Sequence, residues 1–407
     1  MGFIVQKYGG SSVKDAERIQ VVAGRIAEEA REGHQVVVVV SAMGDSTDRL
    51  LELAKQVNPS PPDREMDMLL ATGEQVSIAL LAMALQAVGI PALSLTGPQA
   101  GIRTDRVYGK GKIQGIDTNR IRKALDEGQA VIVAGFQGIN AEQDITTLGR
   151  GGSDLTAVAL AAALKADICE IYTDVDGIYT ADPRIVPEAR KLDVISYDEA
   201  LELASLGAKV LQSRSVEFGK RYNVPLRVLS SFKQGKGTVV MAENEVMEAV
   251  VVRGAALNTD EAKLTVLDVP DRPGMAAAVF SALADQHINV DMIVQNTSEE
   301  GETDISFTVP RTDVRKSLDA LQRVAEEVGA QGVSSPKNIA KLSIVGIGMR
   351  SHTGIASKLF AVLAEHEINI DMISTSEIKV SVVIEEEGAE EALRVVHRAF
   401  ELDKSDE

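Results

Sequence analysis

The chain has 407 residues, of which 45% are hydrophobic and 25% are charged. At roughly 100–200 residues per domain, this length predicts about two to four domains with enough apolar residues for a core in each. The 60 acidic and 42 basic residues give a formal net charge of -18, which argues against nucleic acid or an anionic membrane as the main partner. The single cysteine, Cys169, excludes an internal disulfide and a zinc site built from several cysteines.

The N-terminal residues do not resemble a targeting segment. Strand-like residues 3–5 open the chain, without the basic region and apolar core of a signal peptide. The most apolar stretch, residues 76–85, is too short to span a bilayer. We therefore expect a soluble, cytoplasmic protein.

The first 230 residues or so alternate short apolar runs with longer helical patterns. This alternation predicts an α/β domain with a largely parallel sheet, whose ligand sites lie in loops at the carboxyl ends of the strands. The predicted strands include residues 36–40, 130–134 and 168–172, and the predicted helices residues 15–31, 73–88, 118–127 and 155–165.

The C-terminal part contains an internal repeat. Residues 273–293 recur at residues 353–373, with the same glycine-led helix start and the same Ile-Asn-x-Asp-Met-Ile motif. Each copy has the order βαββα, in which the Ile-Asn motif begins the second strand. The second copy leaves no room for a closing strand before Glu407. We expect the apolar residues 249–253, which precede the first copy, to complete the sheet of the second copy.

A glycine-rich loop follows the first predicted strand, with the sequence Lys-Tyr-Gly-Gly-Ser-Ser at residues 7–12. Glycines let the backbone approach a ligand closely, and free amides at a helix start attract anionic oxygens. The loop therefore indicates a phosphate site, with a plain glycine turn as the alternative. It is not the Gly-x4-Gly-Lys-Ser/Thr type, and the protein-kinase signatures are absent from the sequence.

Three further loops carry polar residues at the ends of predicted strands. Residues 41–48 cluster small polar donors, which alone also suit ordinary turns. Residues 147–154 offer Arg150, which can bind a carboxylate with two hydrogen bonds, and a carboxylate at a helix start, although a capped helix is the simpler alternative. Residues 173–184 open like a calcium loop, but Ile185 stands where the closing glutamate is needed, so calcium is not expected.

Taken together, the motifs at residues 7–12, 149–154 and 173–184 resemble those of the aspartate kinases (aspartokinases) of the amino acid kinase superfamily, and the repeats resemble ACT domains. The resemblance covers nearly the whole chain. It implies a parallel sheet sandwiched by helices in a kinase domain at residues 1–245. A regulatory region at residues 246–407 would hold two interleaved βαββαβ, ferredoxin-like modules. The first would cover about residues 262–338, and the second about residues 341–407, completed by a strand at residues 248–256.

The resemblance implies phosphorylation of the L-aspartate side chain by ATP and Mg²⁺, which gives ADP and 4-phospho-L-aspartate and opens lysine, threonine and methionine biosynthesis. Lys7 and Asp154 would be the catalytic pair, with Asp154 orienting Lys7. Glu74 would bind the amine of aspartate, and Arg150 its α-carboxylate. The implied aspartate-binding residues are Thr47, Glu74, Arg150, Gly151, Gly152, Ser153 and Asp154. The implied nucleotide-binding residues are Lys7, Tyr8, Gly9, Gly10, Ser41, Thr173, Asp174, Tyr179, Arg184 and Lys209.

The chemistry fits these residue types. The side chain of free aspartate has a pKa of about 3.9, so it is ionised at neutral pH and needs no strong general base. An anion must nevertheless approach a polyphosphate, so we expect an electropositive cup made by Lys7, main-chain amides and Mg²⁺. The Mg²⁺ would be carried by ATP, and no metal site of the protein itself is predicted.

The paired ACT modules imply feedback inhibition by threonine, lysine or both, and pairing of modules implies a homodimer or a larger assembly. An α2β2 assembly with a regulatory subunit started internally at Met241 or Met247 is a further possibility. Thr353 departs from the usual pattern, because a proline often stands there in the family. The implied effector-binding residues are Asp271, Gly274, Ala276, Asn289, Asp291, Gln295, Asn369, Ile370 and Ser376.

Two other functions stay open at this stage. Another amino acid or carbamate kinase of the superfamily would share the phosphate loops, but such relatives do not generally combine Glu74, Arg150 and an ACT pair. A non-catalytic amino-acid sensor on a kinase fold would be favoured by loss of Lys7 or Asp154, and both are present.

Overall fold

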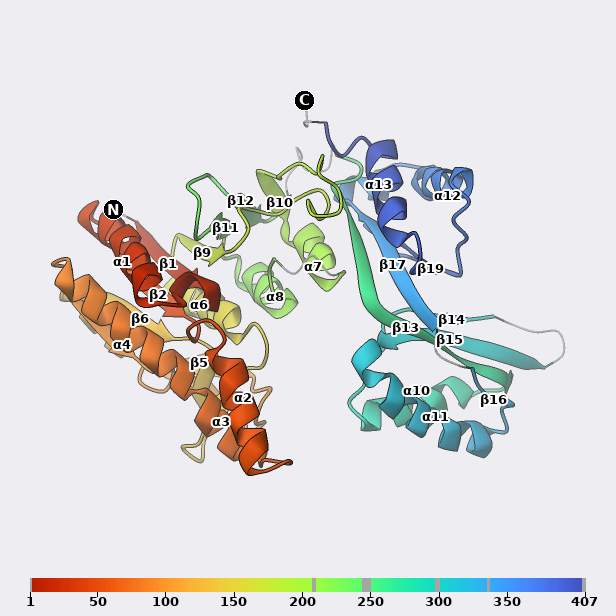
Figure 1. Ribbon diagram of the computed structural model, residues 1–407, viewed down its shortest axis with the longest axis horizontal. Coiled ribbons are helices and arrows are strands. Elements are labelled where there is room, and N and C mark those ends of the chain that lie inside the picture. The colour runs from red at the N-terminus through yellow and green to blue at the C-terminus, as the bar shows by residue number, and fades with distance from the viewer. Residues whose placement is uncertain (1, 207–209, 244–249, 297–300, 335–336, 405–407) are drawn as a thin grey trace. The chain divides into compact units, whose positions relative to one another are not determined.

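The computed structural model describes residues 2–206, 210–243, 250–296, 301–334 and 337–404 (Figure 1). The chain forms two compact units. The N-terminal unit comprises Met1–Tyr179, Lys191–Ser205 and Lys209–Met247. The C-terminal unit comprises Thr180–Arg190, Leu206–Ala208 and Glu248–Glu407, so it includes a short segment from the middle of the kinase-like sequence.

The N-terminal unit is built on an eight-stranded sheet with the order β10-β12-β11-β9-β1-β2-β6-β3. All of its strand pairs are parallel except β11 with β12. The central strands β2 and β6 are almost entirely apolar and buried on both faces, as their continuous apolar runs predict. The strands are β1 (Phe3–Tyr8), β2 (Gln35–Val40), β3 (Ala92–Leu95), β6 (Ala130–Ala134), β9 (Ile168–Thr173), β10 (Val194–Ser196), β11 (Leu226–Ser230) and β12 (Thr238–Met241).

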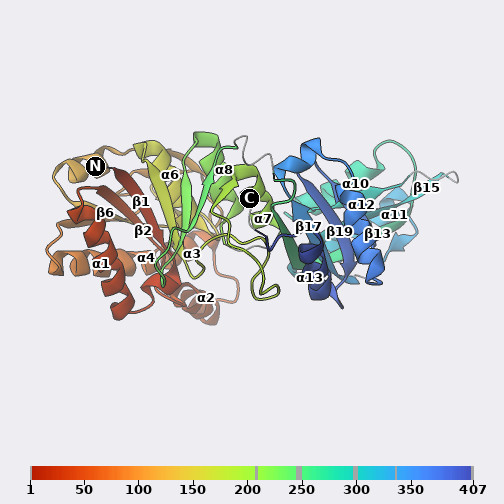
Figure 2. The same ribbon diagram turned by 90° about the horizontal axis from the view of Figure 1, so that it is seen from above.

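Helices cover both faces of this sheet. Helices α1 (Ala16–Arg31) and α4 (Thr72–Ala87) pack their apolar residues on one face, and α6 (Gly152–Leu164) covers the other (Figure 2). The predicted helices agree with these to within a few residues. The largest difference is α6, which begins at Gly152 rather than at residue 155. The remaining helices are η1 (Gly10–Val13), α2 (Ser46–Val57), α3 (Asp63–Leu70), α5 (Asn119–Asp126), α7 (Tyr197–Ser205) and α8 (Ser213–Tyr222).

A second, four-stranded sheet in this unit was not predicted from the sequence. Its order is β5-β4-β7-β8, and its strands are only three or four residues long. Such short strands show no readable alternation of apolar and polar residues. They are β4 (Ile102–Thr104), β5 (Ile113–Ile116), β7 (Gln137–Ile139) and β8 (Ile145–Thr147).

Helices α3 and α4 correct one expectation. Within the described residues, Asp63–Ala87 is the one helical stretch whose length and hydropathy would allow it to cross a membrane, so the apolar segment is longer than residues 76–85. Half of the most apolar 18-residue segment of this stretch is buried inside the structure. Ile78, Leu81 and Leu85 of α4 belong to the core that covers the sheet, which is the arrangement of a core helix.

The C-terminal unit contains a sheet of seven strands in the order β14-β15-β13-β17-β19-β18, with β16 paired to β13. Four long helices pack on it, and the apolar residues of α10 and α11 form one core with β13 and β15. The strands are β13 (Gly254–Pro270), β14 (Ile293–Gln295), β15 (Glu302–Pro310), β16 (Gly332–Val333), β17 (Lys337–Val345), β18 (Met372–Thr375) and β19 (Lys379–Glu385). The helices are α10 (Met275–Asp285), η2 (Arg311–Asp313), α11 (Val314–Val328), η3 (Ile347–Ser351), α12 (Ile355–Glu365) and α13 (Ala389–Ala399).

Strand β13 interleaves the two repeats. Its first part pairs with β17 of the second copy, from Gly254 opposite Val345, and its second part pairs with β15 of the first copy, down to Pro270 opposite Glu302. One strand of 17 residues therefore serves both modules. The part of β13 that precedes the first copy therefore pairs with the second copy.

Three predicted strand boundaries in this unit are wrong. The strand placed at residues 249–253 begins only at Gly254: residues 250–253 are not in a strand, and residue 249 lies outside the described residues. The Ile-Asn residues of the two copies lie in connecting loops, and the strands start later, at Ile293 and Met372. In the first loop Ile288 and Met292 are buried outside the strand, and in the second Ile368 and Ile370 are half-buried, so apolar residues that cover the core produced the strand-like pattern.

Candidate active site

Lys7 and Asp154 meet at the carboxyl edge of the main sheet. Lys7 lies at the end of β1, and Asp154 lies in the first turn of α6, which covers that strand. The Lys7 Nζ is 2.6 Å from the Asp154 Oδ1, and each side chain is 11% exposed. A carboxylate in the first turn of a helix is stabilised by the positive end of the helix dipole. Asp154 therefore lies where it can hold the ammonium group of Lys7 in place.

The loops after β1 and β2 touch each other. The Gly44 N–H donates to the Gly10 carbonyl at 3.1 Å. A Cβ atom at Gly10 would lie 2.8 Å from the Ala42 carbonyl oxygen, so only glycine fits this position without displacement of the backbone. The Ser41 hydroxyl donates to the Ser153 hydroxyl at 3.0 Å and so connects the second loop to the start of α6. Three of the four predicted loops therefore form one surface.

Glu74 lies in the first turn of α4 and is 3% exposed. The Ala42 N–H donates to its Oε1 at 3.1 Å. Its other oxygen, Oε2, is buried and has no hydrogen-bond partner among the residues that the structure describes. Burial raises the pKa of Glu74 to about 7. An unpartnered carboxylate oxygen in this setting suits a cationic ligand group.

All of these residues line one cavity of about 510 Å³. It contains every predicted aspartate-binding residue, together with Lys7, Gly10 and Ser41 of the nucleotide set. Its charged lining corrects the expectation of an electropositive cup, because five carboxyl groups face two cations. The carboxyl groups belong to Asp48, Asp63, Asp67, Glu74 and Asp154, and the cations are Lys7 and Arg150.

Side chains of α8 and its N-cap residue hold the loop that carries Arg150. The Gln212 amide donates to the Arg150 carbonyl at 2.8 Å, and the Arg214 guanidinium donates to the Leu148 carbonyl at 2.8 Å. Gly149 and Gly151 adopt φ angles of 78° and 69°, in the left-handed region that favours glycine. These two glycines therefore allow the backbone path that places Arg150 in the loop.

Sequence reasoning missed Asp67, a buried residue of α3. Its carboxylate accepts hydrogen bonds from the Gly109 N–H at 2.9 Å, the Thr147 N–H at 2.9 Å and the Thr147 hydroxyl at 2.6 Å. Burial raises the pKa of Asp67, and these hydrogen bonds partly oppose the rise. Asp67 thus anchors the strand end that leads into the Arg150 loop. No local pattern distinguishes it from a solvated aspartate on a helix.

Several residues of the predicted nucleotide set do not line the cavity. Tyr8 is fully buried, and its ring stacks on Tyr172 at a centroid distance of 4.6 Å, so its side chain cannot reach a ligand. The Thr173 hydroxyl donates to Asp174 at 3.1 Å, at the carboxyl end of β9 beside β1.

The other described residues of the predicted nucleotide set, Gly9, Tyr179 and Arg184, lie in three different parts of the chain. The Gly9 N–H donates to the Tyr172 carbonyl, and the Tyr179 hydroxyl donates to Asp176 at 2.8 Å. Arg184 belongs to the C-terminal unit and pairs with Asp182 at 2.6 Å. Lys209 lies outside the described residues.

The predicted effector residues lie around β14 and at the start of α10 in the first module, and around β18 in the second. Asp271, Gly274 and Ala276 form the turn into α10, where Gly274 has a φ angle of 100°. Asn289 and Asp291 precede β14, and Gln295 ends it. In the second module Asn369 and Ile370 precede β18, and the Ser376 N–H donates to the Lys379 carbonyl in the turn after it.

The family comparisons agree with this arrangement. A family model described as the amino acid kinase family matches residues 2–230, which covers the cavity and the main sheet except for β12. ACT domain models match residues 263–329 and 342–400. The fold is thus that of an amino acid kinase joined to two ACT domains.

Individual relatives show to which family of amino acid kinases this chain is similar. The chain is 55% identical over 404 residues to the aspartate kinase of Pseudomonas putida, which covers 99% of this chain and 98% of the relative. It is 52% identical over 412 residues to the aspartokinase of Corynebacterium glutamicum, covering 100% of this chain and 98% of that one. The crystal structure of E. coli aspartokinase III with aspartate and ADP matches with a TM-score of 0.82 and 27% identity, over 98% of this chain and 99% of the other. This chain belongs to the aspartate kinase family.

Proposed function

We propose that this chain transfers the terminal phosphoryl group of ATP to the side-chain carboxylate of L-aspartate, giving ADP and 4-phospho-L-aspartate. The observation that carries the proposal is the cavity, in which Glu74 and Arg150 lie on the same lining as Lys7 and Asp154. Glu74 offers an unpartnered carboxylate oxygen for an ammonium group, and Arg150 offers a guanidinium for a carboxylate. An α-amino acid carries both of these groups.

Each residue has a distinct part in the reaction. Lys7 places its ammonium beside the phosphoryl group during its transfer, and Asp154 holds Lys7 in position. The aspartate side chain attacks as an ionised carboxylate, so no residue needs to remove a proton from it. Catalysis then consists mainly of positioning and of stabilising charge.

The acidic lining explains why this reaction needs a metal ion with its nucleotide. Five carboxyl groups in the cavity would repel both ATP and aspartate. Mg²⁺ that arrives with ATP would neutralise part of the phosphate charge, and carboxylate oxygens are suitable neighbours for such a hard cation. The protein would contribute Lys7, the amides around Gly10 and the Ser41 hydroxyl to the phosphates.

Regulation by pathway products is the second part of the proposal. E. coli aspartokinase III has been crystallised with lysine and aspartate, and that structure matches this chain with a TM-score of 0.76 and 28% identity over 98% of this chain and 99% of the other. We propose that lysine, threonine or both bind the ACT modules of this chain and lower its activity. We also propose a cytoplasmic homodimer or larger assembly, with the domain boundaries given above. An internally started regulatory subunit remains part of this proposal.

The test is ADP release from MgATP by the purified full chain. L-Aspartate should support rapid release, and L-glutamate and N-acetylglutamate should not, because their longer carbon chains cannot reach Glu74, Arg150 and the phosphate at once. Release that is faster with either analogue would assign the chain to another reaction of the superfamily. Absence of release with all three compounds, while aspartate still binds, would identify a sensor. Titration of threonine and lysine, separately and together, in the same assay tests the regulatory part.

A further inference from the structure

The segment Thr180–Arg190 belongs to one unit by its packing and lies within the other in the sequence. It is part of the C-terminal unit, whereas Tyr179 before it and Lys191 after it belong to the N-terminal unit. In the sequence it overlaps the predicted nucleotide loop at residues 173–184. It also carries Arg184, one residue of the predicted nucleotide set.

We propose a role for this segment that rests on the regulation proposed above: it transmits the state of the second ACT module to the nucleotide site. Thr180 and His397 are the positioning residues that fasten the segment to that module. An effector can change a distant site only through a part of the chain that differs between its bound and unbound states. The contacts of the segment identify it as such a part.

Every polar group of Thr180 is hydrogen-bonded inside the C-terminal unit. Its N–H donates to the Arg190 carbonyl at 2.8 Å, and its carbonyl accepts from the Ala255 N–H of β13 at 2.7 Å. Its hydroxyl oxygen lies 3.0 Å from the His397 Nε2 of α13 and accepts from the Arg190 N–H at 3.0 Å. Thr180 and His397 are 1% and 2% exposed. These hydrogen bonds join the two ends of the segment and attach it to α13 and β13.

Further contacts hold the segment closely against the same two elements. A Cβ atom at Gly254 of β13 would lie 3.0 Å from the Thr180 carbonyl oxygen, closer than such atoms normally come. The Arg394 Nε of α13 donates to the Ile185 carbonyl at 3.0 Å. Val186, in the middle of the segment, is buried. We therefore expect the segment to move with α13 when the second module changes its conformation.

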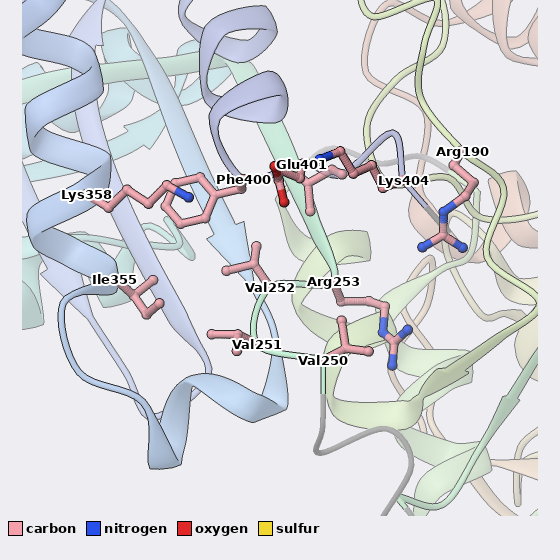
Figure 3. Close-up of a pocket in the computed structure, with 11 residues that line it drawn as sticks. Arg190, Val250, Val251, Val252, Arg253, Ile355, Lys358, Phe400, Glu401 and Lys404 are labelled. Atoms are coloured by element: carbon pink, nitrogen blue, oxygen red, sulfur yellow. Dashed lines mark hydrogen bonds and ion pairs between the residues drawn. The ribbon is translucent and has the colours of Figure 1, made fainter. Parts of the chain in front are cut away.

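The last residue of the segment also lies among residues of the second module. Arg190 lines a cavity of about 420 Å³ in the C-terminal unit, together with Phe400 and Lys404 after α13 and residues 250–253 before β13 (Figure 3). In Figure 3, Lys358 of α12 stands on the opposite side of this cavity from Arg190. Both ends of the segment are therefore next to the second module.

The segment is joined to the predicted nucleotide loop by two paired stretches of chain. Tyr179, which directly precedes Thr180, forms an antiparallel bridge with Lys191. The Leu192 N–H donates to the Ile178 carbonyl at 2.8 Å and continues this pairing. The chain therefore enters and leaves the segment through hydrogen-bonded neighbours rather than through two separate flexible linkers. A displacement of the segment would be passed to the nucleotide loop.

Arg184 is the predicted nucleotide-binding residue that the segment carries. Its guanidinium pairs with Asp182 of the same segment at 2.6 Å, and its side chain is 86% exposed. Its position therefore follows the backbone of the segment. None of the predicted aspartate-binding residues belongs to the segment. We therefore expect an effector to raise the KM for ATP more than the KM for aspartate.

Replacement of Thr180 separates this role from a structural one. Thr180→Val removes the hydroxyl and keeps the shape of the side chain, whereas Thr180→Ser keeps the hydroxyl. Burial lowers the pKa of His397, so its ring is neutral near pH 7 and Thr180→Val leaves no buried charge without a partner. The measurement is ADP release from MgATP and L-aspartate by the purified full chain, with lysine and threonine added separately and together.

The two variants should differ in inhibition and agree in turnover. Thr180→Val should need at least about fivefold more effector for half inhibition, which is the lower end of usual allosteric coupling. Its kcat without effector should stay within about twofold of that of the parent chain, because Thr180 contacts no reacting group. Thr180→Ser should be inhibited like the parent chain.

Arg394 and Arg398 provide a second pair of variants that requires no replacement of a buried residue. Both lie on α13, and neither is buried. Arg394→Met removes the donor to the Ile185 carbonyl and should weaken inhibition severalfold. Arg398→Met removes the same charge from an exposed position on the same helix and should leave inhibition unchanged. This pair tests the role of the segment even if Thr180→Val is unstable.

Isothermal titration calorimetry of effector binding without substrates distinguishes transmission from binding. Effector affinity should change by less than about threefold in Thr180→Val and Arg394→Met. A loss of affinity that matches the loss of inhibition would show that these residues support the effector site itself, and it would overturn the proposed role.

Two further results would contradict the proposed role in different ways. Inhibition like that of the parent chain in both Thr180→Val and Arg394→Met, or an effector that changes only the KM for aspartate, would overturn the role of the segment and leave the proposed activity and regulation intact. Absence of inhibition of the parent chain by lysine and threonine would overturn the proposed regulation, and the role of the segment with it.

Discussion

Lys263 in the first ACT module forms an ion pair with Asp371 in the second, with 3.6 Å between the ammonium nitrogen and a carboxylate oxygen. The reciprocal pair also exists, because Lys341 of the second module contacts Asp291 of the first. Each lysine lies on a central strand of one repeat, and each aspartate belongs to the Ile-Asn-x-Asp-Met motif of the other. The repeated motif therefore joins the modules to each other, in addition to any role in effector binding.

The two reciprocal pairs differ in burial, and this difference predicts unequal effects on stability. The Lys341 side chain is 3% exposed and also contacts Glu261 at 2.6 Å, whereas the Lys263 side chain is 20% exposed. Burial alone would lower the pKa of Lys341, but its hydrogen bonds to Asp291 and Glu261 raise it overall. Lys341→Met should cost about 3–5 kcal/mol of unfolding free energy because Glu261 is left buried without its partner. Lys263→Met should lower the unfolding free energy by about 1 kcal/mol or less. Equal losses for the two variants in urea denaturation would refute this prediction.

Lys7 and Asp154 are predicted to act on turnover, beyond any effect of this buried ion pair on folding. Lys7→Met should lower kcat by about 100-fold or more, because the ammonium acts where charge develops in the transition state. Asp154→Asn should lower kcat by a smaller factor, since it loosens Lys7 without removing it. Initial-rate kinetics and circular dichroism on both variants check this. Near-normal turnover in both would show that the pair has no part in the chemistry.

Glu74 is predicted to give aspartate binding a pH dependence near neutrality. With a pKa of about 7 in the free protein, Glu74 is largely protonated below that pH and cannot pair with an ammonium group. The kcat/KM for aspartate should therefore rise between pH 6 and pH 8. Glu74→Gln should flatten this rise and lower kcat/KM by about 10- to 100-fold at pH 8, the usual loss for a hydrogen bond to a charged group. A parallel profile in the variant would assign the titration to another group.

The same shift predicts a linked effect on stability. Folding raises the pKa of Glu74 from its ordinary value of 4.5 to about 7, so the folded chain binds more protons than the unfolded chain between these values. Its contribution to stability is fully present below about pH 4.5 and is lost as the pH rises through about 7. Glu74→Gln removes this loss. Its midpoint of urea unfolding, relative to that of the parent chain, should be higher at pH 8 than at pH 5.

Asp67 is predicted to be a positioning residue for the aspartate site. Asp67→Asn replaces one of the two acceptor oxygens with an NH2 group, which cannot accept from Gly109 or Thr147, and it should destabilise the chain by about 1–3 kcal/mol. The KM for aspartate should rise more than the KM for ATP, because the Arg150 loop follows Thr147 directly. Thr147→Val removes one of the three hydrogen bonds and should give a weaker effect of the same kind. Equal changes in both KM values would indicate general loosening of the unit.

The Arg150 loop offers a glycine test with a matched control. A Cβ atom at Gly151 would lie 2.3 Å from the Gln212 side chain, and Gly151 also has a positive φ angle. Gly128 has a φ angle of 76° but open space around it. Both alanine variants should lose about 1 kcal/mol from backbone strain. Only Gly151→Ala should also raise the KM for aspartate severalfold, and an unchanged KM would show that the loop tolerates displacement.

The features that depend on local sequence patterns could be predicted from the sequence. The five valines of residues 36–40 form a central strand, and the glycine-rich motifs that follow separate strands meet at one sheet edge because parallel strands end together. The cavity then contains Lys7, Glu74 and Arg150, as the resemblance implied.

Features that depend on contacts between residues far apart in the sequence could not be predicted from local patterns. The role of Asp67 comes from hydrogen bonds to residues far along the chain. The length of β13 follows from its pairing with β15 and β17 together, and neither partner can be identified from the pattern of residues 254–270. The acidic balance of the cavity likewise reflects Asp63, which lies outside the predicted loops, together with Asp48 at the end of the loop at residues 41–48.

The central claim is that this chain makes an acyl phosphate from aspartate, and ³¹P NMR of the reaction mixture tests it most directly. With MgATP, L-aspartate and the full chain, the account predicts a new acyl-phosphate resonance that grows with ADP, disappears on addition of hydroxylamine and is absent with Lys7→Met. ADP that accumulates together with inorganic phosphate alone, under conditions in which added acyl phosphate survives, would contradict it.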